Sequence, residues 1–88
     1  MENDLQWSES QVHWRSRRGL LELDLILIPY AATQYTTLPE AQKQQHHWLL
    51  LQMDMNLQQW LIYRNLPEDL SYTKIDYIKS IWQFIQNR

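Results

Sequence analysis

Helix-start signals recur along this chain and limit its fold more than any other feature of the sequence. In a capping box, a Ser or Thr side chain accepts a hydrogen bond from the amide three residues on, and the side chain there returns one. The box satisfies amides that the first turn of a helix leaves unpaired. Pairs with this spacing are Ser8 with Gln11, Thr37 with Glu40, and Thr73 with Asp76. The chain is therefore expected to fold as short helices.

These signals and the apolar periodicity divide the chain into five helical segments. In chain order they cover residues 8–17, 19–34, from 37, from 54 or 56 to before Leu66-Pro67, and from 73. Pro39 falls in the first turn of the third segment, where its missing N–H is harmless. Because short links join neighbouring helices, we predict an all-α fold, a compact five-helix bundle that forms one domain over residues 1–88.

The segment over residues 19–34 carries two apolar stripes. Its Leu23-Asp24-Leu25 alternation also occurs in strands, but the helical wheel favours a helix. At about 100° per residue, one stripe holds Leu20, Leu23, Leu27, Tyr30 and Ala31, and the other holds Leu21, Leu25, Ile28 and Ala32. Two stripes predict a central helix with neighbours on two sides. Pro29 deletes a backbone hydrogen bond and is expected to kink it.

The apolar faces of the later segments follow the same periodicity. They are Ala41, Trp48, Leu49 and Leu51; then Leu57, Trp60 and Leu61; then Ile75, Ile78, Ile81, Trp82 and Ile85. Most tryptophans are expected in the core because each buries a large area. Trp60 lies on a short helix near a polar turn, so we expect it to be half exposed and to contact a partner, as interface hot spots often do.

Composition excludes several classes of protein. The chain has no cysteine, which excludes disulfides and cysteine-ligated metal sites and suits a reducing compartment. Its net charge of −2 argues against a nucleic-acid partner. Residues 1–4 lack the basic and apolar regions of a signal peptide. The longest apolar run, residues 25–29, is far shorter than a bilayer span. We expect a cytoplasmic protein without direct membrane insertion.

Three arginines form a basic cluster in Arg15-Ser16-Arg17-Arg18. Cations are favourable at a helix C-terminus because of the helix dipole, so one interpretation is a solvated helix end. The other interpretation is an edge that binds an anion or a carboxylate. The sequence leaves both open.

Arg18, Gly19 and Glu22 form a second candidate site. Glu22 lies opposite the two apolar stripes and Arg18, one turn earlier, falls beside it, so both occupy a polar face. Gly19 is the one glycine of the chain, which suggests a sharp turn or the close approach of another surface. The simpler interpretation is a surface ion pair worth roughly 0–1 kcal/mol, with Gly19 at a helix start.

Asp24 falls between the apolar stripes, where an unpaired carboxylate would be costly. An arginine of residues 15–18 is the nearest source of a positive charge. We therefore predict a structural pair that fixes the first helix against the second.

Two adjacent histidines, His46 and His47, raise a metal hypothesis. Adjacent helical residues point about 100° apart and cannot easily chelate one ion, so exposed polar histidines are the favoured interpretation and no metal site is predicted. The sequence shows no nucleophile with a matching base and no phosphate-binding loop, so an enzyme has little support.

One stretch of the chain resembles the SdhE family of succinate dehydrogenase assembly factors. It is Arg17-Arg18-Gly19-Leu20-Leu21-Glu22-Leu23-Asp24, with His13-Trp14 before it and Pro29-Tyr30 after it. The family hallmark is Arg-Gly-x-x-Glu. A second likeness runs through Leu49-Leu50, Asp54, Leu57 and Trp60-Leu61. Asn56 stands where members tend to carry a second acid.

The resemblance implies a chaperone-like protein. Such proteins bind the flavoprotein subunit of succinate dehydrogenase, and often that of fumarate reductase, and promote covalent attachment of FAD to it. The implied partner-binding residues are Arg17, Arg18, Gly19, Glu22 and Trp60. The chain shows no nucleotide motif, so no cofactor of its own is predicted. The alternative is a small regulatory protein-binding module, antitoxin-like, which would recover a small toxin rather than a large flavoprotein in a pull-down.

Overall fold

The computed structural model describes residues 7–87, and within this range the regular structure is helical, without strands. The five α-helices are α1 (Glu9–Arg15), α2 (Leu21–Thr33), α3 (Glu40–Leu50), α4 (Asp54–Leu57) and α5 (Tyr72–Gln86). A 3₁₀ turn at Tyr35–Thr37 follows α2, and a π-helical turn at Gln58–Ile62 extends α4. The prediction of an all-α, five-helix fold is confirmed.

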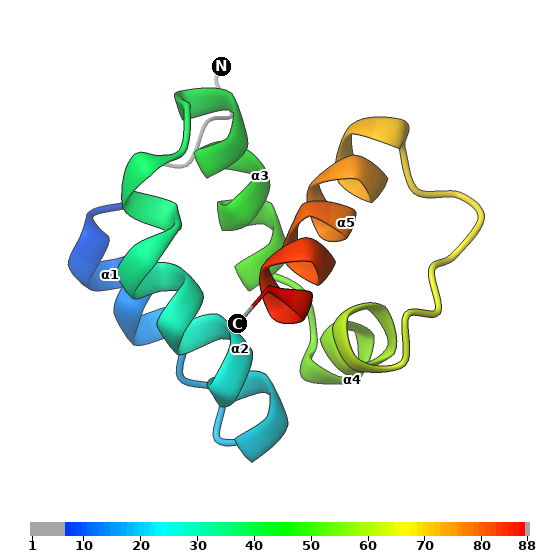
Figure 1. Ribbon diagram of the computed structural model, residues 1–88, viewed down its shortest axis with the longest axis horizontal. Helices are drawn as coiled ribbons and strands as arrows, with labels where there is room; N and C mark the ends of the chain where they lie inside the picture. The colour runs from blue at the N-terminus through cyan, green and yellow to red at the C-terminus, as the bar shows by residue number, and fades with distance from the viewer. Residues whose placement is uncertain (1–6, 88) are drawn as a thin grey trace.

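The helices enclose one core (Figure 1). The α3 helix packs against α1 and α5, while α2 packs against α1 and the π-helical turn. The chain between Ile62 and Tyr72 runs along the outside of the molecule before it enters α5 (Figure 1). The turn that follows α1 lies beside the turn that follows α3, since Arg18 of the first donates hydrogen bonds to the carbonyls of Leu50 and Gln52.

Capping-box spacing predicts three helix starts, and two of them fall close to where the structure places them. Ser8 forms the predicted capping box: its Oγ accepts from the Gln11 amide at 3.2 Å, and Gln11 Oε1 accepts from the Ser8 amide at 2.8 Å. The α5 helix begins earlier than predicted, because Ser71 Oγ caps it by accepting from the Lys74 amide at 3.4 Å. Ser71, and not Thr73, therefore caps this helix.

The capping box predicted at Thr37 and Glu40 is wrong. Thr37 ends the 3₁₀ turn, and its hydroxyl donates to the Gln34 carbonyl at 3.0 Å. Pro39 immediately precedes α3, and its carbonyl accepts from the amides of Gln42 and Lys43. The Thr37 hydroxyl is thus already bonded within the preceding turn, and Pro39 is the N-cap residue of α3.

The α2 helix buries one of its two predicted stripes. Leu23 and Leu27 are fully buried, with Tyr30 and Ala31 beside them. The second stripe is exposed, since Leu21 and Leu25 have exposed fractions of 74% and 54%. The predicted burial of the second stripe is therefore wrong at Leu21 and Leu25, whereas Ile28 is half-buried and α2 does have neighbours in α1 and the π-helical turn. The helix continues through Pro29.

The inward face of α3 also differs from the prediction. His46 and His47 are buried together with Leu49 and Leu50, whereas Ala41 and Leu51 are exposed. The expectation of exposed histidines is therefore wrong. Tyrosine hydroxyls provide the physical reason, since a buried imidazole is tolerated when it is hydrogen-bonded.

A tyrosine–histidine cluster fills the space between α2, α3 and α5. The Tyr77 hydroxyl lies 2.7 Å from His46 Nδ1 and donates to the Tyr30 hydroxyl at 3.1 Å. The Tyr35 hydroxyl lies 2.6 Å from His47 Nε2. Burial lowers the pKa of His46 to about 3, with His47 adding to the shift. Burial also raises the pKa of Tyr30 and Tyr77. His46, Tyr30 and Tyr77 are therefore neutral core residues at physiological pH.

Candidate protein-binding site

The turn between α1 and α2 is built around Gly19. Its φ of +81° lies in the left-handed region that favours glycine. Gly19 is exposed, and a Cβ added there would meet no atom within 4 Å. Glycine is required by the backbone conformation, then, and the space beside it is open to another molecule.

Asp24 holds this turn from the first part of α2. Its Oδ1 accepts a hydrogen bond from the Arg18 amide at 2.7 Å, and the carboxylate is half-buried. The predicted partner was an arginine side chain of residues 15–18. The structure places the main chain of Arg18 there instead, because the Arg18 guanidinium points to another part of the fold. The link between α1 and α2 is still made by Asp24.

The Arg18 side chain ties three segments together. Its Nε donates to Asp54 Oδ1 at 2.7 Å. Its Nη1 donates to the carbonyl of Arg15 at 3.0 Å and to that of Leu50 at 2.9 Å. Its Nη2 donates to the Gln52 carbonyl at 2.8 Å. One guanidinium thus joins the end of α1, the end of α3 and the start of α4, using the fixed fork of donors that only arginine has.

The predicted placement of Arg18 beside Glu22 on one outward polar face is wrong. The Arg18 side chain is only 15% exposed and points toward the turn between α3 and α4. Glu22 is exposed, as predicted, and its side chain makes no hydrogen bond or ion pair with the residues that the structure describes. The two charges therefore have different surroundings: Arg18 is held in place by the protein, and Glu22 faces solvent.

Trp60 is also placed differently from the prediction. Its exposed fraction is 6%, so it is a core residue and not a half-exposed contact. Its ring stacks on Trp48 at a centroid distance of 5.6 Å and an interplanar angle of 9°. Its carbonyl accepts from Trp82 Nε1 at 2.8 Å. The stacking partner lies on α3, which the spacing within the fourth segment could not reveal.

The basic cluster surrounds an open pocket of about 360 Å³. The pocket is lined by Trp14, Arg15, Arg17, Arg18 and Asp54. Asp54 is the residue that sequence reasoning did not connect to this site. The second likeness to the family included Asp54, but no local spacing linked it to an arginine 36 residues earlier.

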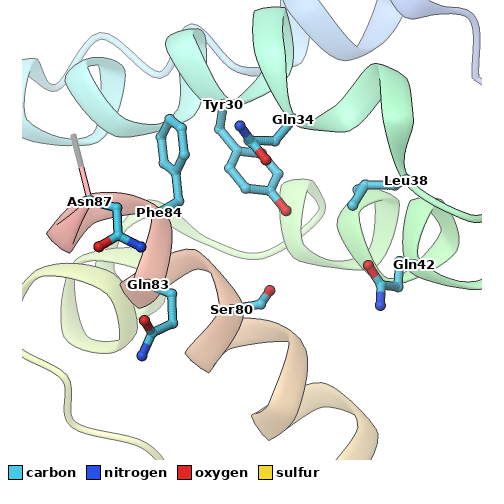
Figure 2. A pocket seen from close by; sticks show the side chains of 8 residues that line it. All are labelled: Tyr30, Gln34, Leu38, Gln42, Ser80, Gln83, Phe84 and Asn87. Atoms are coloured by element: carbon cyan, nitrogen blue, oxygen red, sulfur yellow. The ribbon is translucent and has the colours of Figure 1, made fainter.

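A second and larger pocket, of about 440 Å³, lies between α2, α3 and α5 (Figure 2). It is lined by Tyr30, Gln34, Leu38, Gln42, Ser80, Gln83, Phe84 and Asn87. Primary amides and aromatic rings dominate this lining, and it includes no carboxylate, histidine or lysine. Such a lining supplies no group that would act as a general base near neutral pH.

Within residues 7–87, no group of three or more His, Asp or Glu side chains could hold a metal ion. In the same range, no helix is long and apolar enough to cross a membrane.

Fold and site together define a small all-α protein whose candidate site is a surface for another protein. The turn at Gly19 is fixed from within and open on its outer side, while Glu22 and the second stripe of α2 face solvent. Comparison with known proteins identifies the family. The model of the Sdh5 family, described as "Flavinator of succinate dehydrogenase", matches residues 10–84, and this chain belongs to that family.

Several curated relatives are named FAD assembly factor SdhE. The protein of Pseudomonas putida is 37% identical over 60 residues, which cover 68% of this chain and 71% of that protein. The protein of Legionella pneumophila is 35% identical over 72 residues, covering 82% and 91%. The protein of Pasteurella multocida is 31% identical over 75 residues, covering 84% and 89%. No solved structure matches the chain.

Proposed function

We propose that this protein assists the covalent attachment of FAD to the flavoprotein subunit of succinate dehydrogenase, and that it does so by binding that subunit at the turn between α1 and α2. Membership of the flavinator family supports the proposal, as do relatives named as FAD assembly factors. The observation that carries it is the turn itself: Gly19 is open to a partner while Arg18 and Asp24 hold its backbone in place. The antitoxin-like alternative has no relative among those named above.

The residues around the turn suit a protein partner. Leu21 and Leu25 are largely exposed, and Glu22 lies between them in sequence. Residues four apart on a helix are neighbours, so these leucines form an apolar strip at the start of α2. Protein interfaces combine an apolar centre with charged groups that set orientation. In this proposal the leucines provide contact area and Glu22 provides orientation.

The protein acts in this proposal as an assembly factor and not as a catalyst. A protein that binds one conformer of the flavoprotein shifts the population toward that conformer. Roughly 1.4 kcal/mol of preferential binding gives a tenfold shift. FAD stays with the flavoprotein subunit, and no side chain of this chain needs to touch the flavin.

The experiment is in-gel flavin fluorescence of the flavoprotein subunit from cells that lack this chain and are complemented with variants. Glu22→Gln removes a charge that makes no hydrogen bond or ion pair within the described fold, so its stability is expected to match wild type while the fluorescent band weakens at least severalfold. Glu68→Gln is the matched control, because Glu68 is another exposed acid far along the sequence in the outer loop. Equal bands from both variants and wild type would contradict this placement of the site.

We extend the proposal to the flavoprotein subunit of fumarate reductase. The same gel tests it, because that subunit has its own band. Loss of flavin fluorescence from that band in cells without this chain supports the extension. An unchanged band together with a lost succinate dehydrogenase band restricts the protein to succinate dehydrogenase.

A further inference from the structure

Positive charge is concentrated around the pocket of about 360 Å³ at the end of α1. The whole chain has a net charge of −2 and eight Lys and Arg residues, yet three of the eight line this one pocket. Asp54 is the one acid in the lining, and its Oδ1 already accepts from Arg18. Three cations and one acid leave a local charge of about +2. An acidic protein thus presents a cationic pocket.

The three arginines differ in what their guanidinium groups already bind. Arg18 donates to Asp54 and to three carbonyls. The Arg15 guanidinium lies over the Trp7 ring, 4.4 Å from its centroid. The Arg17 side chain is exposed and makes no hydrogen bond, ion pair or ring contact with the residues that the structure describes. Arg17 is therefore the guanidinium that remains available to an incoming anion.

Pocket chemistry favours a carboxylate over a phosphate. Phosphate sites commonly add main-chain amides to their cations. Here the Arg17 amide donates to the Trp14 carbonyl at 3.3 Å and the Arg18 amide to Asp24, so both are occupied. A guanidinium fork pairs with a carboxylate through two parallel hydrogen bonds. Trp14, 74% exposed, adds an apolar wall, and Met53 and Met55 are exposed on either side of Asp54 in sequence.

We propose that this pocket binds an acidic side chain of the flavoprotein subunit, with Arg17 as the principal contact and Trp14 packing beside the acidic residue. This inference rests on the proposed function and adds a second contact to it, beyond the turn at Gly19. Arg18 joins the two contacts. Its amide belongs to the turn, and its guanidinium belongs to the wall of the pocket. A partner that engages both sites is held in one orientation.

Binding of the purified flavoprotein subunit to the full-length protein, at low and at moderate ionic strength, tests the proposal. Arg17→Glu is expected to weaken binding at least tenfold at low ionic strength, because it sets like charges against each other. Arg17→Lys keeps the charge and is expected to lose less than Arg17→Glu. Lys79→Glu is the matched control, since Lys79 is an exposed cation on α5, outside the pocket.

The outcomes separate this inference from the proposed function. Failure of the wild-type protein to bind the flavoprotein subunit contradicts the proposed function itself. If wild type binds and Arg17→Glu binds as tightly as Lys79→Glu, the proposed function stands and the carboxylate pocket is wrong.

A second measurement identifies the group that enters the pocket. In Arg17→Lys, a carbodiimide joins the new amine directly to a carboxylate that lies against it, and mass spectrometry locates the bond. We expect a cross-link to an Asp or Glu of the flavoprotein subunit. Absence of such a cross-link in a complex that forms overturns the proposal. Binding of free FAD that Arg17→Glu abolishes also overturns it, because the pocket would then be a phosphate site.

Discussion

Replacing Arg18 with alanine separates a structural role of this arginine from a direct contact with the partner. The guanidinium makes four hydrogen bonds, which join the ends of α1 and α3 to the start of α4. Arg17 is its immediate neighbour, and its side chain makes no hydrogen bond or ion pair within the described fold. Arg18→Ala is therefore expected to lower the stability of the fold, whereas Arg17→Ala is expected to leave it nearly unchanged.

The size of the effect follows from the contacts. A hydrogen bond to a charged group contributes roughly 1.5–3 kcal/mol when it is buried. The Arg18 side chain is 15% exposed, but Asp54 is 39% exposed, and water can replace part of what the carbonyls lose. Allowing for this and for non-additive losses, we expect Arg18→Ala to cost about 2–4 kcal/mol of the free energy of unfolding. For a domain of this size each kcal/mol lowers the Tm by roughly 4–8 °C, so we expect a decrease of about 8–32 °C.

Thermal unfolding monitored by circular dichroism measures both variants. A double-mutant cycle with Asp54→Asn then isolates the ion pair, and a coupling energy that differs from zero is expected because the two groups touch. A Tm for Arg18→Ala within about 3 °C of that for Arg17→Ala would refute the reasoning, since 3 °C corresponds to less than about 1 kcal/mol. In that case Arg18 would be a surface residue in solution.

Three further predictions concern the core and the turn. The pKa of His46 is about 3 in the folded state, below its unfolded value near 6.5, so stability is fully present above pH 6.5 and falls on acidification. Between pH 7.5 and 5.5 we expect the free energy of unfolding, measured with urea, to fall by about 1–2 kcal/mol. The same dependence on pH is expected in His13→Gln. Its absence in wild type would show that His46 is not buried. Gly19→Ala is expected to cost about 1–2 kcal/mol through its positive φ alone, and Gly19→Asn less, because Asn tolerates this conformation. Equal Tm values for wild type and both variants would contradict the left-handed conformation at Gly19. Trp60→Ala is expected to cost about 3–5 kcal/mol, with loss of the near-ultraviolet signal of the Trp48–Trp60 stack, whereas a half-exposed Trp60 would cost far less.

Local signals were sufficient for the elements whose start and face depend on nearby residues. The capping box at Ser8 needs only Gln11, three residues away, and both hydrogen bonds form. In α5, Ile78 and Ile81 have helical spacing and are buried. The sequence also placed Asp24 correctly as a carboxylate that needs a partner, because its position between apolar residues is a property of the helix alone.

Tertiary partners decided what the sequence could not predict. The burial of His46 depends on Tyr77, which is 31 residues away, and no pattern within α3 predicts a phenol at hydrogen-bond distance. Arg18 has Asp54 as its partner, 36 residues away, so its side chain turns inward although its helical position suggested an outward face. In each case a distant polar residue supplies a hydrogen-bond partner to a polar residue inside the fold, and such pairs produce no periodic pattern in the sequence.

The Arg-Gly-x-x-Glu pattern therefore combines three different physical roles in five residues. Arg18 fixes the neighbouring segments, Gly19 allows the turn, and Glu22 is exposed. Loss of any one of them would reduce flavin attachment in cells under the proposed function, so a cellular assay alone would give the three residues the same role. Stability measurements separate them, because Arg18 and Gly19 act through the fold while Glu22 makes no hydrogen bond or ion pair within the described residues. A variant at Glu22 that keeps its Tm and loses binding would identify the contact, and a variant at Arg18 that loses both would identify its support.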